Sequence, residues 1–81
     1  MKFKDKWQVY EAINQYKGMN VANIAGFMNW DIKKATKAVK KLLKEGMIEE
    51  RKEGKWFSYY PTSYGKMLKA FKESLKGSHF P

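Results

Sequence analysis

The chain has 81 residues, of which 43% are hydrophobic and 16% aromatic, and its formal net charge is +9. This length allows one small domain, expected over residues 1–81, and the hydrophobic content excludes a disordered tail. The absence of cysteine excludes a disulfide framework and thiolate chemistry. A strongly basic balance points towards nucleic acid or another anionic surface.

The sequence has no feature of a membrane or secreted protein. No apolar run approaches the roughly 18 residues that a membrane span needs. The basic start "MKFKDKW" is not followed by the apolar stretch of a secretory signal. We therefore expect a soluble, cytoplasmic protein.

The first predicted helix covers residues 5–17. Asp5 is a suitable N-cap, and Gly18 is a suitable end. Between them, apolar side chains recur at helical spacing and predict a buried face. These residues are Trp7, Tyr10, Ile13 and Tyr16, with Val9 and Ala12 widening the face.

Two further helices are predicted, over residues 21–28 and 32–45, with a tight turn between them. Asn20 and Asp31 are N-cap candidates, and Asn29 tolerates the left-handed conformation that such a turn needs. The helix over 32–45 has two contrasting faces. Its apolar face consists of Ala35, Ala38, Val39, Leu42 and Leu43. The opposite face consists of Lys33, Lys37, Lys40 and Lys44, flanked by Lys34, Lys41 and Thr36.

Residues 47–60 predict a β-hairpin with strands over 47–52 and 55–60. A two-residue loop at Glu53-Gly54 suits a tight hairpin turn. This loop would set Arg51 opposite Trp56 and Ile48 opposite Tyr59.

The last predicted helix covers about residues 63–76, and Thr62 or Ser63 can cap it. Its apolar side chains fall within one narrow arc and so form a continuous stripe. These residues are Tyr64, Met67, Leu68, Phe71 and Leu75.

The order of these elements resembles a winged helix-turn-helix domain, an α+β fold that is mainly helical. Three helices precede a two-stranded wing hairpin, and a C-terminal helix follows it. "NVANIAGFMNWD" is similar to the second helix and turn of that family, with Trp30 at the apolar position after the turn. "AVKKLLKEGMIEE" resembles the junction from the third helix to the wing. "YYPTSYGKML" resembles the MarR and PadR pattern that leads from the wing into a further helix.

The resemblance implies binding of double-stranded DNA by a small transcriptional regulator associated with the nucleoid. The third helix of this family lies in the major groove, and the wing reaches the adjacent minor groove or backbone. The residues implied on the third helix are Lys33, Lys34, Thr36, Lys37, Lys40 and Lys41. Those implied on the wing are Arg51, Lys52 and Lys55. Because only one cation is arginine, we expect phosphate contacts to dominate and sequence specificity to be modest.

Related regulators pair their terminal helices across a two-fold axis. The resemblance therefore implies a homodimer through Tyr64, Met67, Leu68, Phe71 and Leu75. The alternative is a monomer in which the last helix folds back on the first.

Other functions remain open from the sequence. The lysines could meet an acidic protein surface within a transcription or replication assembly. The aromatic residues could stack on single strands, and the last helix could lie on a membrane surface. Enzyme activity and metal binding have no support, since His79 near the end of the chain is the only histidine. No cofactor or small-molecule ligand is evident.

Overall fold

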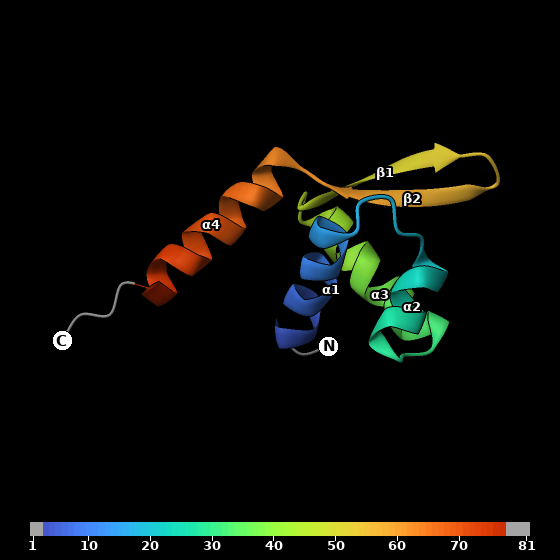
Figure 1. Ribbon diagram of the computed structural model, residues 1–81, viewed down its shortest axis with the longest axis horizontal. Helices are drawn as coiled ribbons and strands as arrows, with labels where there is room; N and C mark the ends of the chain where they lie inside the picture. Colours follow the sequence, from blue (N-terminus) through green and yellow to red (C-terminus); the bar gives the residue numbers. More distant parts are fainter. Residues whose placement is uncertain (1–2, 78–81) are drawn as a thin grey trace.

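The computed structural model describes residues 3–77 and contains four helices and one two-stranded antiparallel sheet (Figure 1). The helices are α1 (Phe3–Gln15), α2 (Val21–Met28), α3 (Ile32–Lys44) and α4 (Ser63–Gly77). The strands are β1 (Ile48–Glu53) and β2 (Trp56–Pro61). This order confirms the predicted mainly helical α+β fold with a wing between the third and fourth helices. His79 lies outside the described residues.

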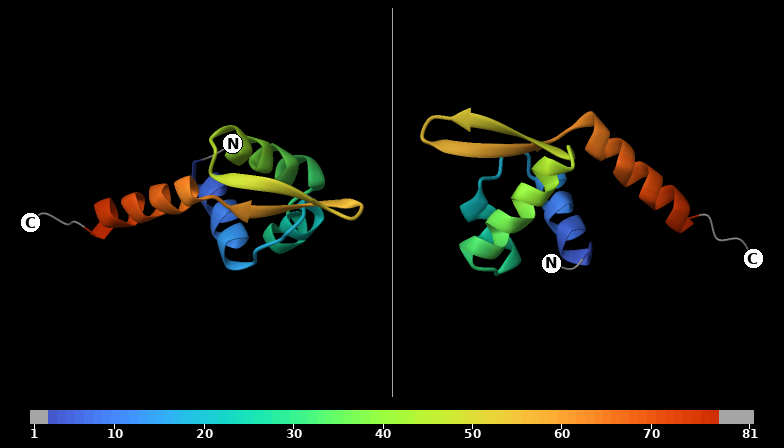
Figure 2. Two further views of the ribbon diagram at one scale, coloured as in Figure 1. Left: turned by 90° about the horizontal axis from the view of Figure 1, so that it is seen from above. Right: turned by 180° about the vertical axis from the view of Figure 1, so that it is seen from behind.

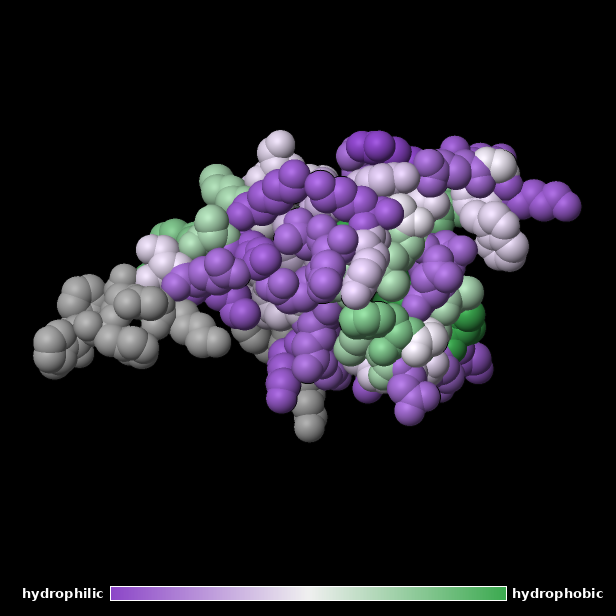
Figure 3. Space-filling model, in the orientation of Figure 1, coloured by the Kyte–Doolittle hydropathy of each residue, from purple (hydrophilic) through white to green (hydrophobic). Residues whose placement is uncertain are grey.

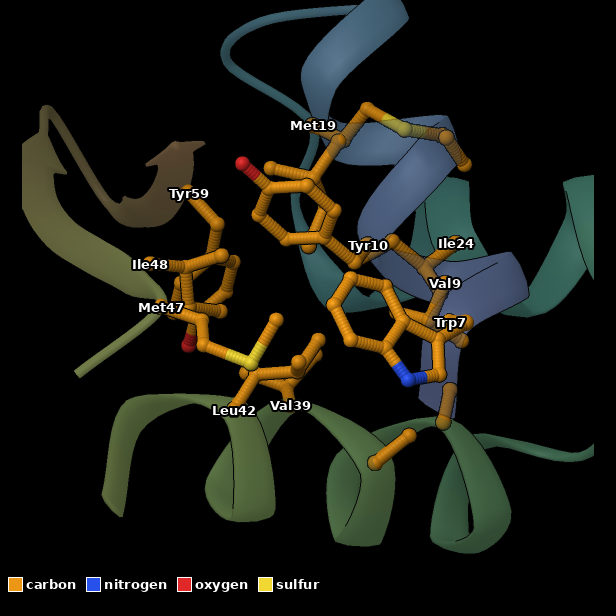
Figure 4. Close-up of a cluster of buried hydrophobic side chains, with 14 of the residues drawn as sticks. Trp7, Val9, Tyr10, Met19, Ile24, Val39, Leu42, Met47, Ile48 and Tyr59 are labelled. Carbon is orange, nitrogen blue, oxygen red and sulfur yellow. The ribbon is translucent and has the colours of Figure 1, made fainter. Parts of the chain in front are cut away.

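A single hydrophobic core joins α1, α2, α3 and the hairpin (Figure 4). The predicted apolar face of α3 supplies much of it, and Leu43 lies at its partly buried edge. The largest fully buried side chains are Val9, Tyr10, Ile13, Ile24, Val39, Leu42 and Met47. Apart from Tyr10, each contributes roughly 1.5–3 kcal/mol by leaving water. The core therefore fixes the inner face of α3 and leaves its polar face outside.

Capping residues determine where α2 begins and ends and where α3 begins. The Asn20 carboxamide oxygen accepts from the Asn23 backbone nitrogen at 2.8 Å and so caps α2. Asn29 ends α2 in the left-handed conformation, with φ of 58°. The Asp31 carboxylate accepts from the Lys34 backbone nitrogen at 2.8 Å and caps α3. All three assignments follow the sequence prediction, and they fix the rotation of α3 about its axis.

The beginning of α1 differs from the prediction. The helix already includes Phe3, so Asp5 lies in its first turn and is not the N-cap. There its carboxylate is favoured by the helix dipole and lies 3.7 Å from the Lys34 ammonium. Tyr16 is not buried as the apolar spacing predicted. It lies beyond the end of α1, is 48% exposed and meets the edge of Phe27.

The register of the hairpin was also predicted wrongly. The loop consists of Gly54 and Lys55, one residue later than expected. Gly54 has φ of +65° and takes the first central position of the turn, where glycine adopts this conformation without strain. The observed pairs are Ile48 with Pro61, Arg51 with Ser58 and Glu53 with Trp56. Each partner moves by two positions, so every side chain stays on its expected face of the sheet.

A close approach at Gly65 sets the direction in which α4 leaves the body. The Thr62 hydroxyl donates to the Gly46 carbonyl at 2.7 Å and accepts from the Gly65 backbone nitrogen at 2.9 Å. A side chain on Gly65 would overlap the Met47 carbonyl. The helix then extends away from the body, as both views in Figure 2 show.

Candidate nucleic-acid interface

Four lysines form an uninterrupted row along the outer face of α3. We call Lys33, Lys37, Lys40 and Lys44 the lysine stripe. All four are exposed, and none lies within ion-pair distance of a carboxylate among residues 3–77. Seen from behind in Figure 2, α3 lies in front of α1 and α2, and no other helix or strand crosses its outer side. The stripe is therefore a concentrated positive surface whose charges are not neutralised by the described part of the chain.

Lys34 and Lys41 differ from the lysine stripe because they face acidic partners. The Lys34 ammonium lies 3.7 Å from the Asp5 carboxylate and 4.3 Å from the centre of the Trp30 ring. Lys41 lies 3.9 Å from Glu45, which also pairs with Lys6. Part of the charge of both side chains is thus compensated within the protein.

Thr36 is partly buried, and its hydroxyl is used within the helix. The hydroxyl donates to the Ile32 carbonyl at 2.7 Å. Its lone pairs remain able to accept a hydrogen bond. A role for Thr36 as a donor to a base would require this internal bond to break.

A shallow hollow of about 610 Å³ extends along the same side of α3. It brings together five of the six α3 residues predicted to contact DNA and leaves Lys41 outside. Its lining residues are Asp31, Ile32, Lys33, Lys34, Thr36, Lys37 and Lys40.

The wing compensates much of its own charge. Arg51 donates to Glu49 at 2.7 Å, and its guanidinium lies 4.1 Å from the centre of the Tyr60 ring. Lys52 and Lys55 are exposed and have no acidic partner among the described residues. The three predicted wing residues therefore comprise one paired and two free cations.

Hydrogen bonds within the wing also shift the pKa values of several of its side chains. The bond to Glu49 raises the pKa of Arg51, and bonds from Ser58 and Tyr60 lower the pKa of Glu53. Burial, together with the hydrogen bond that its hydroxyl donates to Glu50 at 2.8 Å, raises the pKa of Tyr59 to about 12. Local donors therefore favour the ionised form of Glu53.

Three apolar side chains beside the lysine stripe were not predicted as part of a site. Ile32 is 54% exposed, Trp56 63% and Phe57 47%. Large aromatics usually supply the core in so small a domain, so exposure of the aromatic pair was not expected. The available signal was their position beside the hairpin turn, where no other element covers the strand.

The apolar residues predicted for dimerisation fall into two groups. Leu68 is partly buried against the core. Tyr64, Met67, Phe71 and Leu75 are 49–62% exposed, and we call them the α4 stripe. Apolar atoms are visible on the α4 side of the surface in Figure 3.

No helix within residues 3–77 is long and apolar enough to cross a membrane. The described residues also contain no cluster of His, Asp or Glu side chains that could hold a metal ion.

No protein-family model matches this chain, and no curated protein matches it. Solved structures do match it. A MarR protein from Peptoclostridium difficile is 18% identical and has a TM-score of 0.79, covering 90% of this chain and 50% of that protein. FabT from Streptococcus pneumoniae, solved in complex with DNA, is 13% identical with a TM-score of 0.75, covering 99% and 63%.

A MarR family regulator from Listeria monocytogenes, solved with a 26mer DNA, is 19% identical and has a TM-score of 0.72, covering 94% and 57%. These similarities define the class of fold as a winged helix-turn-helix. More specifically, the chain has the MarR-like form of that fold, as its sequence predicted. The chain spans between half and just under two thirds of the length of these structures.

Proposed function

We propose that this chain binds double-stranded DNA and acts as a transcriptional regulator of modest sequence specificity at the nucleoid. The observation that carries the proposal is the lysine stripe, whose four ammonium groups have no carboxylate partner among the described residues. Like charges three or four positions apart destabilise a helix. A partner with a regular row of negative charges would relieve that repulsion.

Duplex DNA supplies such a row on both sides of its major groove. Lysine side chains are long and flexible enough to reach the phosphates, and their binding releases condensed counterions. Lysine meets guanine as a compact charge on a flexible stem, whereas arginine presents a rigid planar fork, so bidentate reading of guanine is mostly an arginine contact. The composition of the α3 surface therefore favours affinity over direct reading of bases.

The wing provides the second proposed contact. Lys55 lies in the turn, and Lys52 lies close to it on β1. Arg51 is available only if it leaves Glu49. We therefore assign the wing a smaller share of the affinity than α3.

The comparisons support this proposal through their DNA complexes. Both the FabT and the Listeria monocytogenes structures contain DNA. At 13% and 19% identity these structures share the fold with this chain and no more. The DNA contacts proposed for this chain are therefore inferred from its own residues.

A three-way binding comparison tests the class of partner. Binding to a duplex of random sequence, to polyglutamate and to vesicles containing an anionic lipid should be measured over the same salt series. We expect the duplex to bind most tightly at every salt concentration. Tighter binding to polyglutamate would favour an acidic protein partner, and tighter binding to vesicles a membrane surface.

We also propose that two chains associate through α4. One side of α4 faces α1, where Lys69 lies 3.2 Å from Glu11 and Lys72 lies 4.6 Å from the centre of the Trp7 ring. The α4 stripe faces away from these contacts and stays exposed, so α4 does not fold back to cover it. A contiguous exposed patch of large apolar side chains commonly marks an interface. A dimer would present two copies of α3 to one duplex, roughly 34 Å apart if they enter successive major grooves.

Sedimentation at micromolar concentration tests the dimer. We expect the wild type to sediment as a dimer and Phe71→Glu to sediment as a folded monomer, because a charge cannot be buried cheaply in an apolar interface. Ala70→Glu adds the same single negative charge at an exposed position of α4 outside the stripe and serves as the matched control. A monomeric wild type would contradict the proposal.

A further inference from the structure

Ile32 joins two hollows on the surface. It lines the hollow along the lysine stripe together with Lys33, Thr36 and Lys37. It also lines a smaller groove of about 230 Å³ together with Trp56 and Phe57 of the wing. An apolar surface is therefore continuous with the basic surface of α3.

The apolar groove has no partner within the described chain. Ile32 is the first residue of α3, and it is more than half exposed, as is Trp56. Val21 and Ala22 at the start of α2 also line the groove. Lys55 also lines this groove, and Lys33 lines the adjoining hollow that shares Ile32. Its occupant must therefore combine a small apolar group with nearby negative charge.

The major groove of duplex DNA has this combination where it contains thymine. The C5 methyl group is the apolar feature that distinguishes thymine at the base edge. Phosphates lie on both sides of it. Residues at the N-terminus of a helix that enters the groove come nearest to the base edges, and Ile32 occupies that position on α3.

We propose that Ile32 contacts a thymine methyl group and gives this surface a preference for A·T base pairs, with Trp56 packing on the deoxyribose of the adjacent backbone. This inference rests on the proposed binding of duplex DNA. Thr36 does not supply a competing donor at this place, because its hydroxyl donates to the Ile32 carbonyl. Burial of one methyl group is worth about 0.8 kcal/mol, which corresponds to about a fourfold change in affinity.

The test compares alternating d(A-T) and d(A-U) duplexes of equal length. The two have the same charge and backbone and differ only in the thymine methyl groups. We expect the wild type to bind the d(A-T) duplex about fourfold more tightly for each methyl contacted. Ile32→Ala should bind both duplexes equally, and Ile32→Val should keep most of the preference. Ile32 is exposed, so unchanged melting temperatures should show that these variants remain folded.

Trp56→Ala serves as the matched variant because a sugar contact does not depend on the methyl group. It should weaken binding to both duplexes by the same factor. A preference for d(A-T) that persists in Ile32→Ala would overturn the inference, because it would come from another residue or from the stiffness of the duplex. Tighter binding of a single strand than of either duplex would also overturn it and assign Trp56 to base stacking.

The remaining outcomes separate this inference from the proposed function. Equal, salt-sensitive binding of both duplexes by the wild type would overturn the role of Ile32 and leave duplex binding intact. Binding to neither duplex would overturn both.

Discussion

The outer face of α3 and the wing both present basic side chains but differ in what surrounds them. The helix has six lysines and no acid between Ile32 and Lys44. The hairpin has three basic and three acidic residues between Ile48 and Pro61. In the wing, Glu49 holds Arg51 at 2.7 Å. The comparison shows that the number of cations in a segment does not measure the charge available to a polyanion, because local ion pairs determine it.

The difference follows from the geometry of the two elements. On α3, neighbours at three and four positions are all lysines along the stripe, so each can only repel the next. In the hairpin, alternating charges and facing strands bring acids, hydroxyl groups and Arg51 together. The two elements should therefore respond differently to the same change of charge.

Charge reversal on α3 should have the largest effect. Each phosphate contact contributes about eightfold to affinity at about 0.1 M salt. Lys37→Glu combined with Lys40→Glu removes two contacts and adds repulsion, so we expect a loss on the order of 100-fold or more. Both side chains are exposed, so the fold should persist. Fluorescence anisotropy of a labelled duplex measures the affinity, and circular dichroism checks the fold.

The control for that variant changes the net charge equally at exposed positions away from α3. Lys17→Glu combined with Lys66→Glu should weaken binding only a few-fold, through long-range repulsion. If this control loses as much affinity as the α3 variant, binding depends on net charge alone and the two regions do not differ.

Release of Arg51 should produce a smaller effect of the opposite sign. Glu49→Gln removes the acid that holds the guanidinium, and we expect affinity to rise by up to about eightfold as one phosphate contact is added. Titration of the duplex at fixed salt measures this gain. Glu73→Gln removes an acid that pairs with Lys69 on α4 and is the matched control. An equal gain in both variants would show that the wing has no special role.

The smallest expected effect concerns stability at high pH. The pKa of Tyr59 is raised to about 12 by burial and by the bond to Glu50, whereas its value in the unfolded chain is about 10. Its contribution to stability is therefore present below pH 10 and is lost as the pH rises through 12. At pH 7 the free energy of unfolding of Tyr59→Phe should be roughly 1 kcal/mol below that of the wild type, because the hydrogen bond to Glu50 is lost. Between pH 10 and 12 this free energy should decline less in the variant than in the wild type.

Urea unfolding at pH 7 and at intervals from 10 to 12 provides the comparison. The difference between the two proteins isolates Tyr59 from the lysines, which also titrate in this range. Parallel declines in both proteins would contradict the assignment of the shift to Tyr59.

The sequence predicted the fold because its local signals agree with one another. The caps at Asn20, Asn29 and Asp31 and the apolar arc of α3 all point to the same arrangement. The prediction of the hairpin register failed because Glu53-Gly54 and Gly54-Lys55 are both acceptable two-residue loops by composition. Only the position of Gly54 in the turn distinguishes them.

The candidate site was predicted less completely for a different reason. Helical spacing identifies which lysines share a face, but it does not show that Asp5 of another helix lies beside Lys34. It also does not show that β2 leaves Trp56 beside Ile32. Such contacts join residues far apart in the sequence, and they appear only when the elements are packed together.

The dependence of duplex affinity on salt tests the central claim most directly. With roughly five or six phosphates contacted by one chain, a plot of log K against log salt should have a slope of about −4.5 to −5.4. In Lys37→Ala combined with Lys40→Ala the slope should become shallower by about 1.8, since two contacts are removed. A wild-type slope near zero, or an unchanged slope in the variant, would contradict the claim that the lysine stripe binds the DNA backbone.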